Sequence, residues 1–236
     1  MDLNRFMSDE SFTLDHDLFE KIIYINLKNR TDRNKNILAK LTEMEIPYDK
    51  IIRFEAIETD LGYIGCAQSH AAVMNMVIEN SWGTVLVIED DTDFYTDPEH
   101  IKQANTFLSR LKEKNWDVAL LGGNYFCVYY HEPECCLFNL MMSFCANAYI
   151  VNQHYADKML SIFNESVYLI SETGVPDESK GIDAHWCNFM KDDNWYGLYP
   201  CIAYQAKGIS NIRKGYTDYE YLFNKPLSEL EFHDKE

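Results

Sequence analysis

Positive charge is scarce in this sequence. Its 21 lysine and arginine residues stand against 38 aspartate and glutamate residues, which gives a formal net charge of −17. Non-specific binding to nucleic acid or to an anionic membrane requires clustered cationic side chains, so the composition argues against both as partners. A basic or neutral partner fits better, and so does a divalent cation wherever the acids are densest.

Long apolar runs are missing as well. No window reaches the roughly 18 apolar residues that a membrane-spanning helix needs. The first residues also lack the basic stretch and the apolar core of a secretion signal. We therefore expect no membrane span and a cytoplasmic protein, and a bacterial or viral origin is consistent with this expectation.

Cysteine is present but follows no pairing pattern. The 7 cysteines, an odd number, are scattered along the chain and include no CxxC pair. This distribution is typical of reduced thiols and does not predict a disulfide framework. Cys66 and His70 are four residues apart and could share a zinc ion, but two ligands do not make a site.

The rest of the composition indicates a packed globular protein. Among 236 residues, 47% are apolar and 14% aromatic, and no repeat or low-complexity tract interrupts them. We expect one domain over residues 20–213. A polar lead-in (residues 1–19) would precede it, and a polar, Tyr-rich tail (residues 214–236) would follow it.

Short β-branched runs alternate with helical patterns, mainly in the first half of the chain. Such alternation predicts βαβ units and an α/β fold with a mainly parallel sheet, covered by helices on both faces. Thr31 or Asp32 is the expected N-cap of the first helix, and Asp97 before Pro98 opens the third. Strands are expected at residues 21–27, 51–57, 83–90, 116–123 and 144–151. Helices are expected at residues 31–45, 66–79 and 98–115, and within 152–163 and 181–193.

Four acids follow one buried strand directly. After the apolar run at residues 85–88 come Glu89, Asp90, Asp91 and Asp93. Ligands of open α/β sheets bind beyond the carboxyl ends of the strands, and carboxylate oxygens placed there suit Mn²⁺ or Mg²⁺ bound to substrate phosphates. The alternative is a solvated acidic turn before the helix that Asp97 begins.

Several motifs stand in an order that resembles glycosyltransferase family 25. They are YINLKNRTDRN, FEAI, GCAQSH and VLVIEDD, followed more weakly by ANAYIV, GIDAHW and YPCIAYQAKGISNI, over about residues 21–212. This family contains bacterial lipopolysaccharide β-galactosyltransferases and procollagen hydroxylysine galactosyltransferases. The resemblance implies a GT-A architecture, with a Rossmann-like, mixed and mainly parallel sheet flanked by helices. It also implies sugar transfer from a UDP donor with Mn²⁺.

The resemblance gives the acidic run the role of the metal-binding DxD motif. Glu89 and Asp91 form one x-spaced pair, and Asp91 and Asp93 form another, so the register is open. Asp91 belongs to both pairs and is the expected principal ligand. Asp90 or Glu89 is its neighbour and the expected contact to the ribose or the sugar.

Residues after the first two strands are expected to hold the nucleotide. They are Asn26, Leu27 and Arg30 after the first strand, and Ala56 and Ile57 after the second. Amide and guanidinium donors suit uracil or phosphate, and the second strand would contact uridine through its backbone. The alternatives are a solvated helix start for Arg30 and Arg33, and plain core for Ala56 and Ile57.

Two later segments complete the expected donor site. Gly65 opens a helix whose N-terminal amides suit an anion, and Ser69 and His70 lie on its first turns. The alternative for His70 is a structural histidine with its hydrogen bonds satisfied. The polar segment after residue 204 would fold over a diphosphate, and its candidates are Gln205, Ser210 and Asn211. The family pattern often has Asp at the position of Asn211, which leaves hydrogen bonding as its role.

Asp183, within GIDAHWCNF, is the expected catalytic base. Transfer with inversion requires a carboxylate that removes the proton of the acceptor hydroxyl. The alternative is that Asp183 only caps its helix.

The resemblance thus implies transfer of galactose or glucose from a UDP-hexose to a hydroxyl acceptor. Acceptors in keeping with it are collagen-type hydroxylysine, the sugar attached to it, or a lipopolysaccharide-type oligosaccharide. A degenerate family member that binds nucleotide-sugar or glycan without turnover is the alternative.

Overall fold

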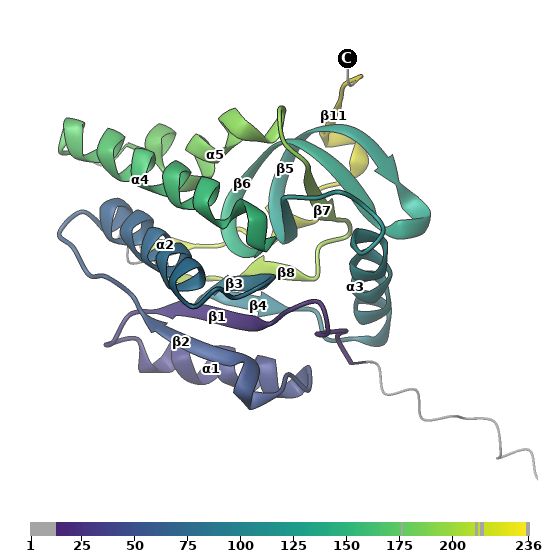
Figure 1. Ribbon diagram of the computed structural model, residues 1–236, viewed down its shortest axis with the longest axis horizontal. Coiled ribbons are helices and arrows are strands. Elements are labelled where there is room, and N and C mark those ends of the chain that lie inside the picture. Colours follow the sequence, from purple (N-terminus) through teal and green to yellow (C-terminus); the bar gives the residue numbers. More distant parts are fainter. Residues whose placement is uncertain (1–12, 176, 211, 213–214, 235–236) are drawn as a thin grey trace, which may run out of the picture.

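The computed structural model describes residues 13–234 apart from Pro176, Asn211, Arg213 and Lys214. A seven-stranded sheet in the order β11-β5-β7-β6-β3-β1-β2 forms its centre (Figure 1). Its strands are β1 (Lys21–Asn26), β2 (Ile51–Glu55), β3 (Val85–Glu89), β5 (Val118–Glu132), β6 (Leu137–Val151), β7 (Trp195–Leu198) and β11 (Glu231–Phe232). The helices are α1 (Thr31–Glu43), α2 (Gly62–Glu79), α3 (Pro98–Leu111), α4 (Ala156–Thr173), α5 (Ile182–Met190) and α6 (Glu220–Phe223).

Most strands of the central sheet run in one direction. β1 is parallel to β2 and β3, and β5 is parallel to β7 and β11. Of the strands described, β6 is reversed and pairs antiparallel with β3, β5 and β7. The expected fold class, an α/β protein with a mixed and mainly parallel sheet flanked by helices, is confirmed.

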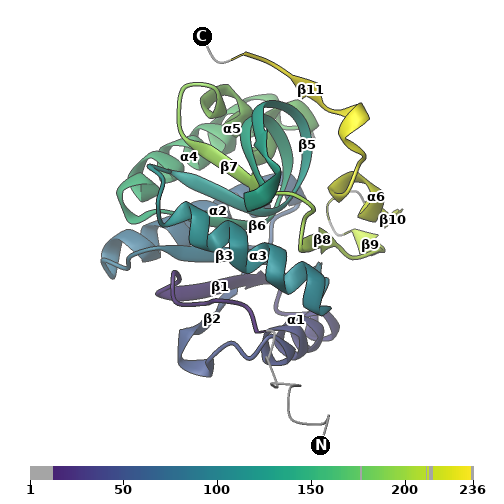
Figure 2. The same cartoon turned by 90° about the vertical axis from the view of Figure 1, so that its right-hand side faces the viewer.

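Apolar clusters cover both faces of the sheet. Helices α2, α4 and α5 pack on one face, and α1 and α3 pack on the other (Figures 1 and 2). Along β1, Ile23 and Ile25 enter the first cluster, whereas Ile22 and Tyr24 enter the second. A strand buried on both faces needs apolar residues at consecutive positions, which explains the unbroken apolar runs in the sequence.

Two helix starts differ from the prediction. The expected N-cap of α1 is wrong, because the helix begins at Thr31 with Arg30 as the flanking residue, and no side chain caps it. The expected opening of the second helix at Gly65 is also wrong. Helix α2 begins at Gly62, and the Gly65 N–H donates to the Leu61 carbonyl at 3.3 Å. The Gly65 amide is therefore used within the helix.

The start of α3 agrees with the prediction. Asp97 precedes Pro98 and accepts a hydrogen bond from the His100 N–H at 3.3 Å. Proline at the first helical position lacks an N–H that the helix would otherwise leave unpaired, so this sequence begins a helix well.

The segments expected as polar lead-in and tail contribute apolar residues where the structure describes them. Leu14 and Phe19 are buried in the second cluster, and Phe223 and Leu230 are buried in the first. Strand β11 adds an edge to the sheet beside β5. The domain limits at residues 20 and 213 stay predictions. Within the described part of the chain, no helix is both long enough and apolar enough to cross a membrane.

Two short sheets extend the fold beyond the carboxyl end of β3. β4 (Thr92–Phe94) pairs antiparallel with β8 (Ala203–Gln205), and β9 (Gly208–Ser210) pairs antiparallel with β10 (Gly215–Thr217). The first of them brings a segment from late in the chain against the acids that follow β3.

Candidate functional site

The acids after β3 lie where four segments meet. Glu89 ends β3 beside Ile25 of the parallel strand β1, and Thr92 of β4 is in register with Gln205 of β8. The Ala206 N–H donates to the Asp91 carbonyl at 2.7 Å. The end of β1, the start of α1 and the β8 segment therefore surround the end of β3.

Arg33 of α1 lies among these acids. Arg33 Nη1 is 2.8 Å from Asp90 Oδ1 and 3.0 Å from Asp91 Oδ2, and all three side chains are largely buried. Arg33 Nη2 donates to the Ile209 carbonyl of β9 at 2.9 Å. The guanidinium thus neutralises part of the acidic charge and joins α1 to β9.

Arg30, the arginine expected at the donor site, has another partner. Its guanidinium makes paired hydrogen bonds of 3.0 and 2.9 Å with Asp32 in the first turn of α1. The Arg30 N–H donates to the Leu27 carbonyl at 3.0 Å, which forms the turn between β1 and α1. The sequence treats Arg30 and Arg33 alike, and the structure brings Arg33 to the acids.

Asn26 holds Asp90 in place. Its Nδ2 donates to Asp90 Oδ2 at 2.7 Å and to the Arg30 carbonyl at 3.0 Å, and its Oδ1 accepts from Arg53 Nε at 2.9 Å. The Asn26 amide is therefore bonded to protein groups on both sides, and it acts on the site through Asp90.

Asp91 is short of positive charge. Its Oδ2 contacts Arg33 and accepts a 3.4 Å hydrogen bond from Gln205, but its Oδ1 is buried and has no hydrogen-bond partner among the described residues. Burial, followed by the negative charge of Glu89, raises the pKa of Asp91 from 3.8 to about 7, although Arg33 opposes the shift. A buried carboxyl oxygen without a partner fits a site that receives a cation.

Asp93 faces a different neighbour. Its Oδ1 is 3.3 Å from Lys40 Nζ of α1 and accepts from the Phe94 N–H at 2.8 Å. Within the described part of the chain, Glu89, Asp91 and Asp93 do not form a group of three ligand atoms that all lie within 4.8 Å of one another. The metal roles of the three acids stay predictions.

The loop after β2 is held tightly against α2. Ser69 Oγ accepts from the Ile57 N–H at 2.8 Å and donates to the Gly65 carbonyl at 2.6 Å. A Cβ atom at Gly65 would lie 2.4 Å from the Ile57 carbonyl oxygen, so only glycine fits there. The Ala56 N–H donates to the Asn26 carbonyl at 3.0 Å, which places this loop beside the end of β1.

His70 is buried and contacts partners on both sides of its ring. Nδ1 lies 2.7 Å from the Tyr149 hydroxyl, and Nε2 lies 3.3 Å from Glu89 Oε1. The Cys66 thiol donates to the same Glu89 oxygen at 3.7 Å. No local pattern indicates this contact, because β3 lies almost twenty residues beyond α2's first turns.

Asp183 lies in the first turn of α5 and reaches out of the helix. Its Oδ1 accepts from the Ala184 N–H and its Oδ2 accepts from the Cys145 N–H of β6, both at 2.9 Å. Cys145 has a left-handed backbone conformation, with φ of 70°, which is uncommon for a residue other than glycine. Burial raises the pKa of Asp183, and the negative charge of Glu89 raises it further.

Two further expected residues, Gln205 and Ser210, lie on β8 and β9. Gln205 contacts Asp91, and Ser210 follows Ile209, whose carbonyl Arg33 binds. Asn211 lies outside the described residues. The structure thus brings Asn26, Asp90, Asp91 and Gln205 into one network through direct contacts.

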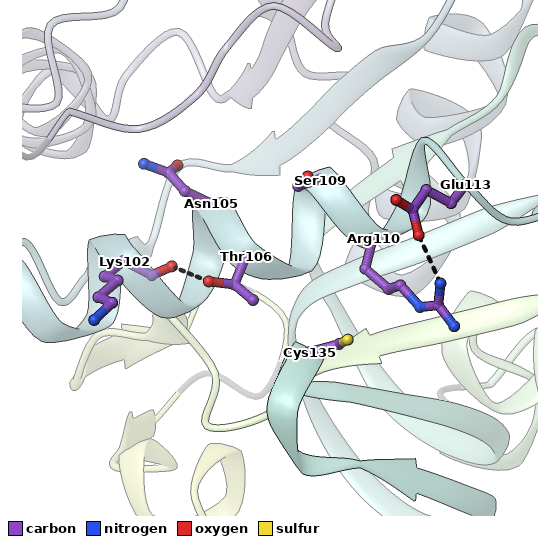
Figure 3. Close-up of a pocket in the computed structure, with 7 residues that line it drawn as sticks. All are labelled: Lys102, Asn105, Thr106, Ser109, Arg110, Glu113 and Cys135. Atoms are coloured by element: carbon purple, nitrogen blue, oxygen red, sulfur yellow. Dashed lines mark hydrogen bonds and ion pairs between the residues drawn. The ribbon is translucent and has the colours of Figure 1, made fainter.

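A hollow beside α3 contains none of these residues. It has a volume of about 540 Å³, and Figure 3 shows its lining side chains along α3 with Cys135 opposite. Arg110 pairs with Glu113 at 2.7 Å, and Thr106 donates to the Lys102 carbonyl. Asn105 bonds to the Thr13 carbonyl and the Asp15 N–H, so these polar side chains already have protein partners. The hollow does not include the acidic strand end.

Comparison with known proteins gives one family match. The model of glycosyltransferase family 25, described as an LPS biosynthesis protein family, matches residues 57–173. The matched part contains Ser69, His70 and the four acids after β3, and it ends before Asp183 and Gln205. No curated protein matches the chain.

Solved structures of low identity share parts of the fold. Mannose-1-phosphate geranyltransferase from Thermus thermophilus is 10% identical with a TM-score of 0.45, over 77% of this chain and 73% of that one. The glycosyltransferase GlyE of Streptococcus pneumoniae is 14% identical with a TM-score of 0.41, over 77% of this chain but 45% of GlyE. A glycosyltransferase involved in glycosylation of the major capsid of PBCV-1 is 9% identical with a TM-score of 0.38, over 75% of this chain and 92% of that one. Likenesses this remote do not bear on substrate or mechanism.

Proposed function

We propose, from the match of residues 57–173 to the model of glycosyltransferase family 25, that the protein transfers a hexose from a UDP-sugar to a hydroxyl group. The hexose would be galactose or glucose. The family description names LPS biosynthesis, which favours an oligosaccharide acceptor. Collagen-type hydroxylysine, or the sugar attached to it, is the other acceptor in keeping with the family resemblance.

The proposal of a divalent cation is based on Asp91. Its buried Oδ1 has no partner among the described residues, and burial, followed by the negative charge of Glu89, raises its pKa. Asp91 would hold Mn²⁺ or Mg²⁺, with Glu89 or Asp93 as the second carboxylate, and Asp90 would contact the ribose or the sugar. When bound, the cation stabilises the negative charge that develops on the diphosphate as it leaves.

Donor binding would use the groups gathered around these acids. Arg33 already lies between Asp90 and β9, so its guanidinium is placed to bind a diphosphate that arrives there. Gln205, Ser210 and Asn211 would contribute hydrogen bonds from the late segment. The turn at Leu27 and Arg30 and the loop at Ala56 and Ile57 would contact the nucleoside.

Asp183 would act as the catalytic base. As the acceptor oxygen attacks the anomeric carbon, the bond from that carbon to UDP breaks on the opposite face, and the hydroxyl proton passes to Asp183 Oδ1 or Oδ2. This sequence inverts the anomeric centre. The raised pKa of Asp183 supports the assignment, because a base whose pKa is nearer neutrality accepts a proton more effectively.

The test is release of UDP from a panel of UDP-sugars, with and without Mn²⁺. The protein, Asp91→Asn and a control, Asp97→Asn, would be compared. Asparagine caps helices as well as aspartate does, so the control keeps the N-cap of α3 and changes the same charge outside the site. We expect one UDP-hexose to be consumed only with metal, and we expect Asp91→Asn to lose this activity while Asp97→Asn keeps it.

The other outcomes are also informative. If UDP-sugar binds in a metal-dependent way but is never consumed, even with glycan and hydroxylysine acceptors present, the chain is a binding protein and the transferase proposal is wrong. If no UDP-sugar is bound or consumed under any metal condition, the acidic strand end is not a donor site.

A further inference from the structure

Three side chains of different chemistry converge beside the acidic strand end. Cys66 and His70 lie one turn apart on α2, and Glu89 ends β3. Their sulfur, nitrogen and oxygen atoms all lie within 4.8 Å of one another. We propose that Cys66, His70 and Glu89 form a zinc site. With Glu89 bound to zinc, Asp93 is the second carboxylate of the cation site proposed at Asp91.

The distances between the ligand atoms match those around zinc. Zinc binds sulfur at about 2.3 Å and nitrogen or oxygen at about 2.0–2.1 Å, so a tetrahedral ion holds sulfur and oxygen about 3.6 Å apart, and nitrogen and oxygen about 3.3 Å apart. Cys66 Sγ is 3.7 Å and His70 Nε2 is 3.3 Å from Glu89 Oε1. Both distances to the Glu89 oxygen therefore suit a tetrahedral zinc ion.

The histidine is already oriented for binding. Its Nδ1 lies 2.7 Å from the Tyr149 hydroxyl, and the two rings stack with centroids 5.7 Å apart. A partner on the second ring nitrogen is typical of histidines that bind metals, because it fixes the tautomer and the ring orientation. His70 and Tyr149 are both buried, so this arrangement is rigid.

The ligand set selects a different metal from the donor site. Mn²⁺ and Mg²⁺ prefer oxygen ligands, whereas a thiolate with an imidazole and a carboxylate suits zinc. Three protein ligands leave the fourth position of a tetrahedral ion for water or a substrate group. Zinc here would tie α2 to the end of β3 and fix the strand that directly precedes Asp90 and Asp91.

A second group offers an internal comparison. Cys127, Glu231 and His233 also bring a sulfur, an oxygen and a nitrogen within 4.8 Å. Glu231 and His233 are exposed on β11 and beyond it, with 74% and 44% of their side chains accessible. An exposed pair must lose conformational freedom to bind an ion, so we expect zinc first at Cys66, His70 and Glu89, where His70 is buried and the other two are half-buried.

The test adds Zn²⁺ or Co²⁺ to the metal-stripped full chain without any UDP-sugar. We expect one equivalent of tight zinc, and with cobalt a sulfur-to-metal charge-transfer band together with the visible bands of a tetrahedral ion. Tyr149→Phe should weaken zinc binding by about 10- to 100-fold, and Cys66→Ser should weaken it more and abolish the charge-transfer band. The double variant Cys127→Ser/His233→Ala should bind zinc as the natural chain does.

Two further variants distinguish a failure of the zinc proposal from a failure of the donor-site proposal and from misfolding. Asp91→Asn should keep zinc, so a failed transferase assay does not decide the zinc proposal. Glu89→Gln repeats the test if Cys66→Ser does not fold, as judged by circular dichroism. The proposal is wrong if the stripped chain takes up no zinc, if both ligand variants bind it normally, or if the double variant alone removes it.

Discussion

Arg33 Nη1 lies 3.0 Å from Asp91 Oδ2, with 15% and 14% of the two side chains exposed. The same nitrogen is 2.8 Å from Asp90, so one guanidinium serves two carboxylates. Because Glu89 adds a third negative charge nearby, one arginine does not neutralise the group. The negative charge that remains is the charge that would attract a cation to this strand end.

Removal of Arg33 should destabilise the metal-free protein. Arg33→Ala leaves two buried carboxylates without their cation, and we expect a loss of about 3 kcal/mol in the free energy of unfolding. Mn²⁺ should recover part of this loss by supplying the missing charge. Urea unfolding with and without Mn²⁺ measures both effects. Arg30→Ala, which removes a pair with the exposed Asp32, should cost less than about 1 kcal/mol, and equal losses would show that Arg33 has no special role.

The raised pKa of Asp91 should appear in the pH dependence of stability. The folded state binds this proton more tightly than the unfolded state, because the pKa rises from 3.8 to about 7 on folding. For this group, stability is therefore greatest below pH 4 and falls as the pH rises toward 7, by at most about 1.4 kcal/mol per pH unit. Asp91→Asn removes the titration.

The measurement is thermal unfolding of the metal-free natural chain and of Asp91→Asn between pH 4 and pH 8. The variant should gain stability relative to the natural chain as the pH rises to about 7, and the difference should then stay constant. A difference that does not depend on pH would contradict the assignment.

Asp183 should affect turnover and not donor binding. Asparagine can still accept from the Cys145 N–H but cannot remove a proton, so Asp183→Asn should lower kcat by roughly 10²- to 10⁴-fold. The KM for the UDP-sugar should change little. Asp177→Asn is the control, because Asp177 is half-buried outside the site and asparagine can also accept from the Ser179 N–H. Full activity of Asp183→Asn would exclude a catalytic base at this position.

Gly65 should be intolerant of any side chain. In Gly65→Ala, the new Cβ would lie 2.4 Å from the Ile57 carbonyl oxygen and 2.9 Å from Thr59 Oγ1, so backbone must move. We expect a loss of about 1–3 kcal/mol and a higher KM for the UDP-sugar, because the loop after β2 shifts. Gly208→Ala, with nothing within 4 Å of its new Cβ, should unfold at the same temperature as the natural chain. Calorimetry measures the stability of both variants, and donor titration measures their binding of UDP-sugar. If Gly65→Ala leaves both quantities unchanged, the loop adjusts freely and the prediction is wrong.

The sequence predicts the order of the helices and strands better than it predicts which side chains contact one another. Consecutive apolar residues in β1 and β3 indicate strands buried on both faces, and Asp97 with Pro98 indicates the start of α3. Contacts between elements depend on packing that no local pattern records, as for His70 with Glu89. The start of α2 differs from the prediction. Leu61 precedes it and makes no side-chain cap, so the sequence has no capping signal at this helix start.

The two arginines after β1 are a second example of side-chain partners that the sequence does not predict. Arg30 and Arg33 have the same chemistry and lie within one turn of each other. Their different partners follow from the direction in which α1 leaves the sheet, which turns Arg33 toward β3 and leaves Arg30 with Asp32.

The hydrogen bond from Arg33 Nη2 to the Ile209 carbonyl has a thermodynamic consequence. An arriving phosphate that draws the guanidinium to itself must break this bond and release β9 from α1. Donor affinity and the position of β9 are then coupled, and such coupling is reciprocal. A change that weakens only this hydrogen bond, and leaves Ser210 in place, would therefore strengthen donor binding by the free energy that breaking the bond costs.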